Sequence, residues 1–327
     1  HHGTDAEWSV VVRRVLASKA ALMPVFALLF LPLLWVAPIL WEWWTIPPGQ
    51  DHLLDQKAGY LNHTFFYIRA AAFIGLMSLV AFRLRHWSTA QDADGDHLRT
   101  IKMRWWTFAG LPIFAVSLSF AAIDWVKAMD HHWFSTMFPV YIFAGTAGSS
   151  MALLILTTLW LKSKGYLEVV TVQHYHIMGK FMLAFTIFWA YIGYDQYMLI
   201  WYANIPEETV YYIIRNQGNW NILSTALVAL RFFLPFPILL TQWVKKDPAK
   251  LKWIAMLIIA MQLLDMFVVV LPTLKKTGFG FLDVAYAICP LVGIGGILAW
   301  LFLKKLGANY LFPTKDPRLA GSLNLHN

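Results

Sequence analysis

The chain has 327 residues, of which 59% are hydrophobic, 16% aromatic and only 13% charged. This composition excludes an ordinary soluble domain and is typical of a polytopic membrane protein. The formal net charge of +8 does not indicate nucleic-acid binding, because the basic residues lie in short loops between apolar runs. The single cysteine, Cys289, excludes a disulfide within the chain and a cysteine-ligated zinc or iron–sulfur site.

Eight apolar runs of 21 to 26 residues follow one another along the chain. At about 1.5 Å per residue each can cross a hydrocarbon layer of about 30 Å, so the sequence predicts an all-α, polytopic transmembrane helical bundle. The prediction is one integral membrane domain over residues 1–327, with four spans in 20–161, four in 177–303 and a tail at 304–327. The runs are 20–41, 61–82, 105–126, 137–161, 177–202, 220–244, 251–271 and 281–303.

The loops between these runs differ in positive charge from one side to the other. Loops on one side hold 18 Lys and Arg residues, and loops on the other hold 5. Since cytoplasmic loops retain positive charge, we expect both termini in the cytoplasm. Prolines predict kinks in the first and sixth spans, at Pro24, Pro32, Pro38, Pro235 and Pro237.

Several ionisable residues interrupt the apolar runs, and such residues are more often functional than not. By helical rise, Arg69, Asp195, Arg231 and Asp265 all lie within about 9 to 16 Å of the non-cytoplasmic side. They predict either packing pairs or a polar path for protons. The candidates for a proton path are Asp124, His174, His176, Lys180, Tyr194, Asp195, Tyr202, Glu207, Glu208, Arg231 and Asp265.

Aromatic residues around the fifth span raise a second hypothesis, a quinone site. Its candidate residues are Arg69, Tyr191, Gln196 and Trp201. The alternative is that these aromatic side chains are interfacial anchors. Likewise Lys180 is close enough to the cytoplasmic interface to snorkel, and His174 and His176 suit either a proton uptake point or a solvated helix start.

The histidines fall at span ends or in loops, as at His63, His131, His132, His174 and His176. A haem held between spans needs histidine within them, so we expect no haem in this chain. His174 and His176 are two residues apart and point in different directions on a helix, which is poor spacing for one metal ion. The sequence therefore predicts no haem and no metal ion bound by this chain.

Two blocks carry a family resemblance. HYHIMGK (174–180) with FWAYIGYDQYMLIWYANIPEET (188–209), and DWVKAMDHHWFSTMFPVYIFAG (124–145), resemble the NrfD/PsrC-like membrane subunits of the ActF type in bacterial alternative complex III, a quinol:cytochrome c oxidoreductase. The matching residues are Asp124, Asp130, His132, His174, His176, Lys180, Tyr194, Gln196, Tyr202, Glu207 and Glu208. Two positions depart from the family pattern, Ile177 and Asp195. Ile177 weakens the expected cytoplasmic half-path, while Asp195 offers an acid of its own.

The resemblance implies a cofactor-free, non-catalytic subunit of two four-helix bundles in the bacterial inner membrane, with two further N-terminal spans missing from this chain. It implies that quinone or quinol, c-type haems and iron–sulfur clusters reside in partner subunits. The implied partners are membrane lipid, a second NrfD-like subunit, periplasmic iron–sulfur and multihaem cytochrome c subunits, and a terminal oxidase. The alternatives are a structural docking subunit and an independent ion or solute transporter.

Overall fold

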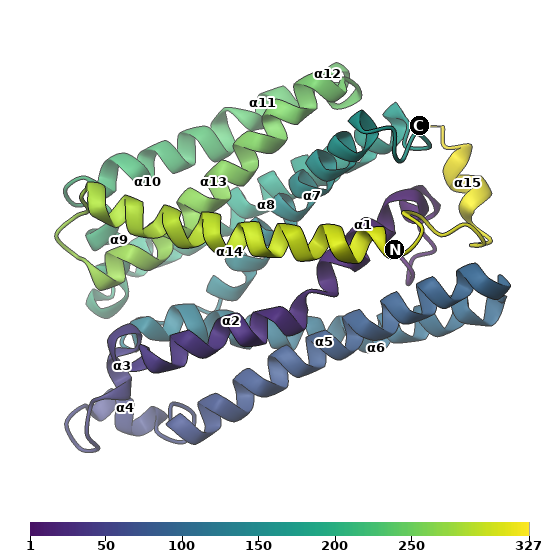
Figure 1. Ribbon diagram of the computed structural model, residues 1–327. Helices are drawn as coiled ribbons and strands as arrows, with labels where there is room; N and C mark the ends of the chain where they lie inside the picture. The colour runs from purple at the N-terminus through teal and green to yellow at the C-terminus, as the bar shows by residue number, and fades with distance from the viewer. Residues whose placement is uncertain (327) are drawn as a thin grey trace.

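The computed structural model describes residues 1–326, and within that range the chain is built from helices without strands (Figure 1). Eight helical segments are long and apolar enough to cross a membrane, which confirms the predicted fold class and number of spans. They are Glu7–Trp35, His63–Asp94, His97–Met129, Phe138–Ser163, Val172–Ala203, Trp220–Leu240, Pro248–Leu274 and Phe281–Gly307. The protein is therefore an integral membrane protein, in which helices satisfy their own backbone groups where water is absent.

The elements follow in one order along the chain. They are η1 Glu7–Ser9, α1 Val10–Ala20, α2 Met23–Trp35, α3 Ala37–Leu40, η2 Glu42–Trp44, α4 His52–Lys57, α5 His63–Asp94, α6 His97–Ala121, η3 Ala122–Val126, η4 Lys127–Met129, α7 Phe138–Ser163, α8 Val172–Ala203, α9 Pro206–Arg215, α10 Trp220–Val228, η5 Ala229–Phe233, α11 Pro235–Leu240, α12 Gln242–Lys246, α13 Pro248–Leu274, α14 Phe281–Gly307 and α15 Leu319–Leu323. Two of them, η3 and η5, are π-helical turns.

The first span begins earlier than the predicted residue 20 and ends before the predicted residue 41. Its helical stretch starts at Glu7 because Arg13 and Arg14 are buried through partners, which hydropathy alone does not reveal. Arg13 pairs with Asp316 in the C-terminal tail, and Arg14 pairs with Asp92 at 2.5 Å. These contacts hold both ends of the chain at one end of the molecule.

Prolines interrupt the helices as expected at three places. Pro24, Pro38 and Pro235 each lie in the first turn of a new helix, where a missing N–H costs nothing. In contrast, α2 continues through Pro32. The sixth span is consequently divided into α10, η5 and α11, and this division shapes the site described below.

The long helices form two packed groups joined through α1 and α7. In one, α5 packs along α6 and α2 lies against α5; in the other, α7 packs against α8 and α13. Figure 1 shows α3, α4 and α9 at one end of the molecule, and the N-terminus, α12 and α15 at the other. The α14 helix lies on the outside, and within the described chain Leu306 is its one buried residue.

Candidate functional site: a cavity beside a buried ion pair

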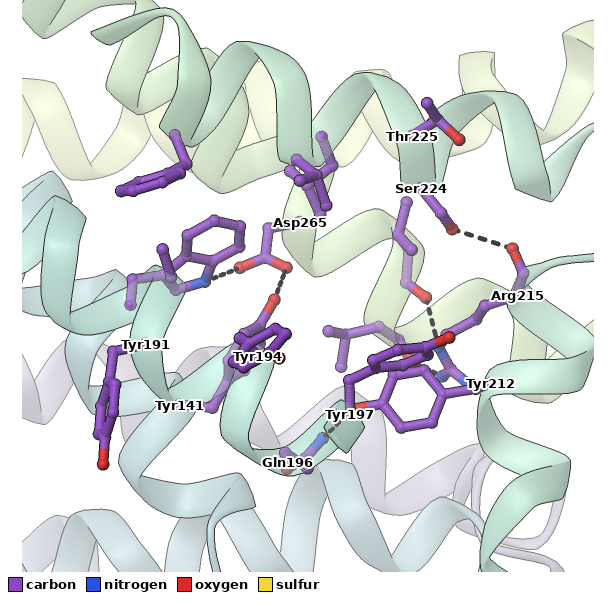
Figure 2. A pocket seen from close by; sticks show the side chains of 18 of the residues that line it. Tyr141, Tyr191, Tyr194, Gln196, Tyr197, Tyr212, Arg215, Ser224, Thr225 and Asp265 are labelled. Atoms are coloured by element: carbon purple, nitrogen blue, oxygen red, sulfur yellow. Dashed lines mark hydrogen bonds between the residues drawn. The ribbon is translucent and has the colours of Figure 1, made fainter. Parts of the chain in front are cut away.

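A cavity of about 750 Å³ lies between α8, α9, α10, η5 and α13. Nine of its 22 lining residues are aromatic, and Figure 2 shows many of the lining side chains. Tyr191 and Tyr194 line it from α8 and are each 62% exposed, so the cavity opens toward the lipid-facing surface. A cavity of this size and composition suits an amphipathic ligand with a flat ring.

Asp265, on α13, supplies the buried acid of the cavity. It is 1% exposed. Tyr141 donates its hydroxyl to Oδ1 at 2.5 Å, and Trp189 donates its indole N–H to Oδ2 at 3.1 Å (Figure 2). Arg231 forms an ion pair with the same carboxylate. The carboxylate thus meets three donors from three separate helical segments.

Arg231 is held on its other side as well. Its Nη2 donates to Gln262 Oε1 at 2.5 Å, and its guanidinium lies 4.2 Å from the centroid of a Trp189 ring. Gly145 on α7 leaves room for this arrangement, because a Cβ there would lie 2.7 Å from Arg231 Nη2 and 2.8 Å from Gln262 Oε1. The absence of a side chain at position 145 is therefore part of the site.

The π-helical turn η5 presents Arg231 to the bundle interior. The backbone N–H of Leu234 donates to the carbonyl of Ala229 at 2.9 Å, five residues earlier. Pro235 follows and has no N–H to continue the ladder to Arg231. A π turn and a proline together rotate and open the helix at this point, which is a common feature of functional sites.

A second basic side chain, Arg215 of α9, lies across the cavity and was not among the predicted site residues. Its Nε donates to the carbonyl of Val268 at 3.0 Å, and its Nη2 donates to that of Val269 at 2.6 Å. The Val268 carbonyl lacks its usual helical donor because Pro272 stands four residues later. In the sequence, Pro272 indicated a carbonyl without a helical donor. Nothing in the sequence showed that Arg215 is the side chain that donates to this carbonyl.

Tyrosines of α9 complete this wall. The guanidinium of Arg215 lies 3.4 Å from the centroid of the Tyr211 ring. Tyr212 receives a hydrogen bond from Gln196 Nε2 at 3.0 Å, and Ser135 donates to Gln196 Oε1 at 3.0 Å. Burial raises the pKa of Tyr211 and of Tyr212 above the ordinary phenol value. Both phenols therefore remain protonated and available as donors at neutral pH.

Arg69 and Asp124 form a second buried pair away from this cavity. Arg69 Nε lies 2.6 Å from Asp124 Oδ2, and Tyr60 donates to Asp124 Oδ1 at 2.8 Å. Asp124 belongs to the π-helical turn η3, as Arg231 belongs to η5. Sequence reasoning placed Arg69 near Asp195; in the structure its carboxylate partner is Asp124.

The structure brings together only part of the predicted set. Tyr191, Tyr194, Gln196 and Asp265 line the cavity, and Arg231 pairs with Asp265. Asp195 is half-buried and, among residues 1–326, makes no ion pair or hydrogen bond. The remaining candidates outside the cavity lining include Trp201 and Tyr202, which are 65% and 84% exposed, and Glu207 and Glu208 in the first turn of α9.

The residues predicted to take up protons, His174 and His176, lie toward the other end of α8. His174 is fully buried, and its Nδ1 accepts the backbone N–H of Thr171 at 3.1 Å, as part of a capping box. His176 is also buried, whereas Lys180 is exposed. His174 precedes Trp189 by 15 residues, or about 22 Å of helix. His174 thus caps the start of α8, well away from Trp189 and the Asp265 carboxylate that Trp189 contacts.

Chemically, the site offers a protonatable carboxylate beside a phenol, fixed cations on two sides and an aromatic cavity open to lipid. This arrangement can bind an amphipathic ring or hold a proton within the bilayer. A scan against protein-family models and a search of curated proteins found no match to this chain.

Proposed function

We propose that this chain is a membrane subunit of a respiratory quinol:acceptor oxidoreductase of the alternative complex III type, in which it supports proton translocation and assembly. The observation that carries the proposal is Asp265, a buried carboxylate within a membrane span, joined to Tyr141 and Arg231 beside the cavity. The two blocks at 124–145 and 174–209 that resemble ActF-type subunits support the choice of complex.

The energetics favour a functional role for the Asp265 and Arg231 pair over a purely structural one. Desolvating two charges costs several kcal/mol per ion, and apolar residues of similar volume often pack as stably or better. Protonation of Asp265 would weaken its attraction to Arg231, so that a proton on the carboxylate changes the packing of α13 against η5. This coupling is what a proton-translocating subunit requires.

The proposed setting follows from the same resemblance and from loop charge. The chain lies in a bacterial inner membrane with both termini cytoplasmic, as the 18 to 5 distribution of basic residues favours. A second NrfD-like subunit, periplasmic iron–sulfur and multihaem cytochrome c subunits and a terminal oxidase are the proposed partners. Quinol, haems and iron–sulfur clusters belong to those partners in this proposal.

A second candidate function is quinol binding by this chain itself, which the cavity favours. Two of the four predicted quinone residues, Tyr191 and Gln196, line it, whereas Arg69 and Trp201 lie outside. A quinol ring could stack on the tyrosines while its hydroxyl groups meet Tyr141 or Asp265. Photolabelling of the complex with an azidoquinone tests this function, since labelling confined to peptides that do not line the cavity, outside α7 to α10, η5 and α13, would refute it.

Proton stoichiometry tests the main proposal. We expect Asp265→Asn to lower the number of protons moved per electron in vesicles that contain the whole complex, whereas Asp195→Asn, the half-buried control, leaves it unchanged. Because Asp265→Asn leaves Arg231 unpaired, the double variant with Arg231→Gln removes both charges and separates proton transfer from folding.

Three outcomes distinguish the alternatives. An unchanged stoichiometry in the double variant would rule out a proton path through Asp265. If partner subunits were lost while the remaining complex moved the normal number of protons per electron, the chain would be a docking subunit. Transport by the purified chain alone in vesicles, with no haem or iron–sulfur signals copurifying from the native membrane, would replace the respiratory proposal by an independent transporter.

A further inference from the structure

The segment between α3 and α4, two helices that Figure 1 shows at one end of the molecule, contributes to a cluster of histidine and carboxylate side chains. The cluster joins η2, which holds Glu42, to the loop after η4, which holds His131 and His132. One possible ligand atom of each of these three residues lies within 4.8 Å of the other two. The cluster is separate from the cavity at Asp265 and does not depend on the function proposed for it.

Asp51 organises the two imidazole rings. Its Oδ2 lies 2.8 Å from Nε2 of His131 and 2.8 Å from Nε2 of His132. Asp51 is fixed in turn as the N-cap of α4, where its Oδ1 accepts the backbone N–H groups of Leu53 and Leu54. A carboxylate that accepts from Nε2–H leaves the Nδ1 of a neutral imidazole unprotonated, with its lone pair free.

The Nδ1 of His131 is the second observation. The His131 side chain is 0% exposed, and its Nδ1 is buried with no hydrogen-bond partner in the described part of the chain. A buried nitrogen without a partner costs free energy, which a bound cation would remove. His131 therefore has the arrangement of a metal-bound histidine, with a carboxylate on one nitrogen and an open lone pair on the other.

We propose that Glu42, His131 and His132 bind one divalent transition-metal ion of the Zn²⁺ class, with Asp51 as the carboxylate that orients both imidazoles. Two imidazoles and one carboxylate are a donor set that Zn²⁺ takes in proteins, with a water in the fourth position. Ligands at about 2.0 to 2.2 Å from the ion lie roughly 3.4 Å apart in a tetrahedron, so side chains whose ligand atoms lie within 4.8 Å of one another need to close by at most about 1.4 Å.

The surroundings allow this closure. Glu42 is exposed and the His132 side chain is 53% exposed, so both can rotate toward the buried ring of His131. The two carboxylates of Glu42 and Asp51 balance the double charge of the ion. Lys57 Nζ donates to the carbonyl of His131 at 2.7 Å and so holds the loop without taking up the ligand atoms.

The bound ion would tie together two segments that lie about 90 residues apart in the chain, at Glu42 and at His131. These segments enclose the aromatic core of Trp41, Trp43 and Phe66 at this end of the bundle. The metal would thus hold α4 and the loop after η4 together at this end of the bundle.

The test uses the full chain purified in detergent with an affinity tag free of histidine, stripped with a chelator and dialysed against stoichiometric Zn²⁺. We expect one equivalent of Zn²⁺ retained by the wild type, and a dissociation constant raised roughly tenfold or more in Glu42→Gln and in His132→Ala. Asp51→Asn keeps an N-cap residue but should weaken binding by about 10- to 100-fold. His52→Ala, an exposed neighbour outside the cluster, should bind as the wild type does.

Cobalt gives an independent readout of geometry. Co²⁺ added to the stripped wild type should produce the intense visible absorption of a four- or five-coordinate site, and His132→Ala should abolish it. Equal retention of Zn²⁺ by the wild type and by the double variant Glu42→Gln/His132→Ala would overturn the proposal. The bound ion would then lie elsewhere, such as at His1 and His2. A weak, octahedral Co²⁺ spectrum in the wild type would overturn it as well.

Discussion

Replacing Gly145 by alanine probes the packing of the buried ion pair without touching either charge. The new Cβ would lie 2.7 Å from Arg231 Nη2 and 2.8 Å from Gln262 Oε1, closer than real Cβ contacts. Either the guanidinium or the amide must move, and the hydrogen bond between them is lost or lengthened. Gly145→Ala is thus a test of whether Arg231 is held where the structure shows it.

The change in the free energy of unfolding caused by Gly145→Ala is the sum of two opposing contributions. Exchange of glycine for alanine within a helix stabilises by about 0.5 to 1 kcal/mol. Loss of a buried hydrogen bond to a charged group costs about 1.5 to 3 kcal/mol. We therefore expect Gly145→Ala to lower the free energy of unfolding by about 0.5 to 2.5 kcal/mol.

The matched control is Gly75→Ala. Gly75 also lies inside a long helix, α5, and a Cβ there meets nothing within 4 Å, so this variant should be as stable as the wild type or up to about 1 kcal/mol more stable. Unfolding in mixed detergent micelles, followed by tryptophan fluorescence, measures both variants. If Gly145→Ala proved as stable as Gly75→Ala, the close contact between α7 and Arg231 would be wrong.

Two further predictions concern other charged groups. Arg215→Ala should lower the free energy of unfolding by about 1 to 3 kcal/mol, because it leaves the carbonyl of Val268 buried without a donor. In a Pro272→Ala background, which restores a helical N–H to that carbonyl, chemical denaturation should show a smaller loss. An equal loss in both backgrounds would refute the role of Arg215 as the donor to Val268. Burial raises the pKa of Asp316, but the hydrogen bond from Arg318 and the charge of Arg13 outweigh it and bring the pKa to about 2. The carboxylate therefore stabilises the fold above its ordinary pKa of 3.8 and loses this effect as the pH falls toward 2, so the stability difference between the wild type and Asp316→Asn should shrink over that window; a constant difference would contradict the pairing.

The fold could be predicted from the sequence because spanning a membrane leaves few alternatives. A run of 20 or more apolar residues identifies a span whatever its neighbours are, and all eight were found in this way. The ends of the spans were harder. α8 starts at Val172 rather than 177 because Thr171 and His174 form a capping box, and the first span extends back to Glu7 because distant acids pair with its arginines.

The candidate site was only half visible in the sequence, for a physical reason. Helical rise gives the depth of a residue in the bilayer, but the direction in which its side chain points depends on packing. Depth alone put Asp195 beside Arg69, whereas the π-helical turn η3 turns Asp124 toward it. Arg215 was assigned to a loop, since nothing local in the sequence shows that α9 folds back to place it against α13.

The two π-helical turns also limit how the chain can vary in length. A π turn holds one residue more than an α turn, so removal of a single residue from Ala229–Phe233 would convert it into an α-helical turn ahead of Pro235. Because the π turn absorbs its extra residue locally, the segments on either side would keep nearly the same orientation, whereas Arg231, inside the turn, would no longer be placed against Asp265. The same holds for Asp124 in Ala122–Val126 and its partner Arg69. In these two short segments, loss of one residue is therefore a larger change than most substitutions.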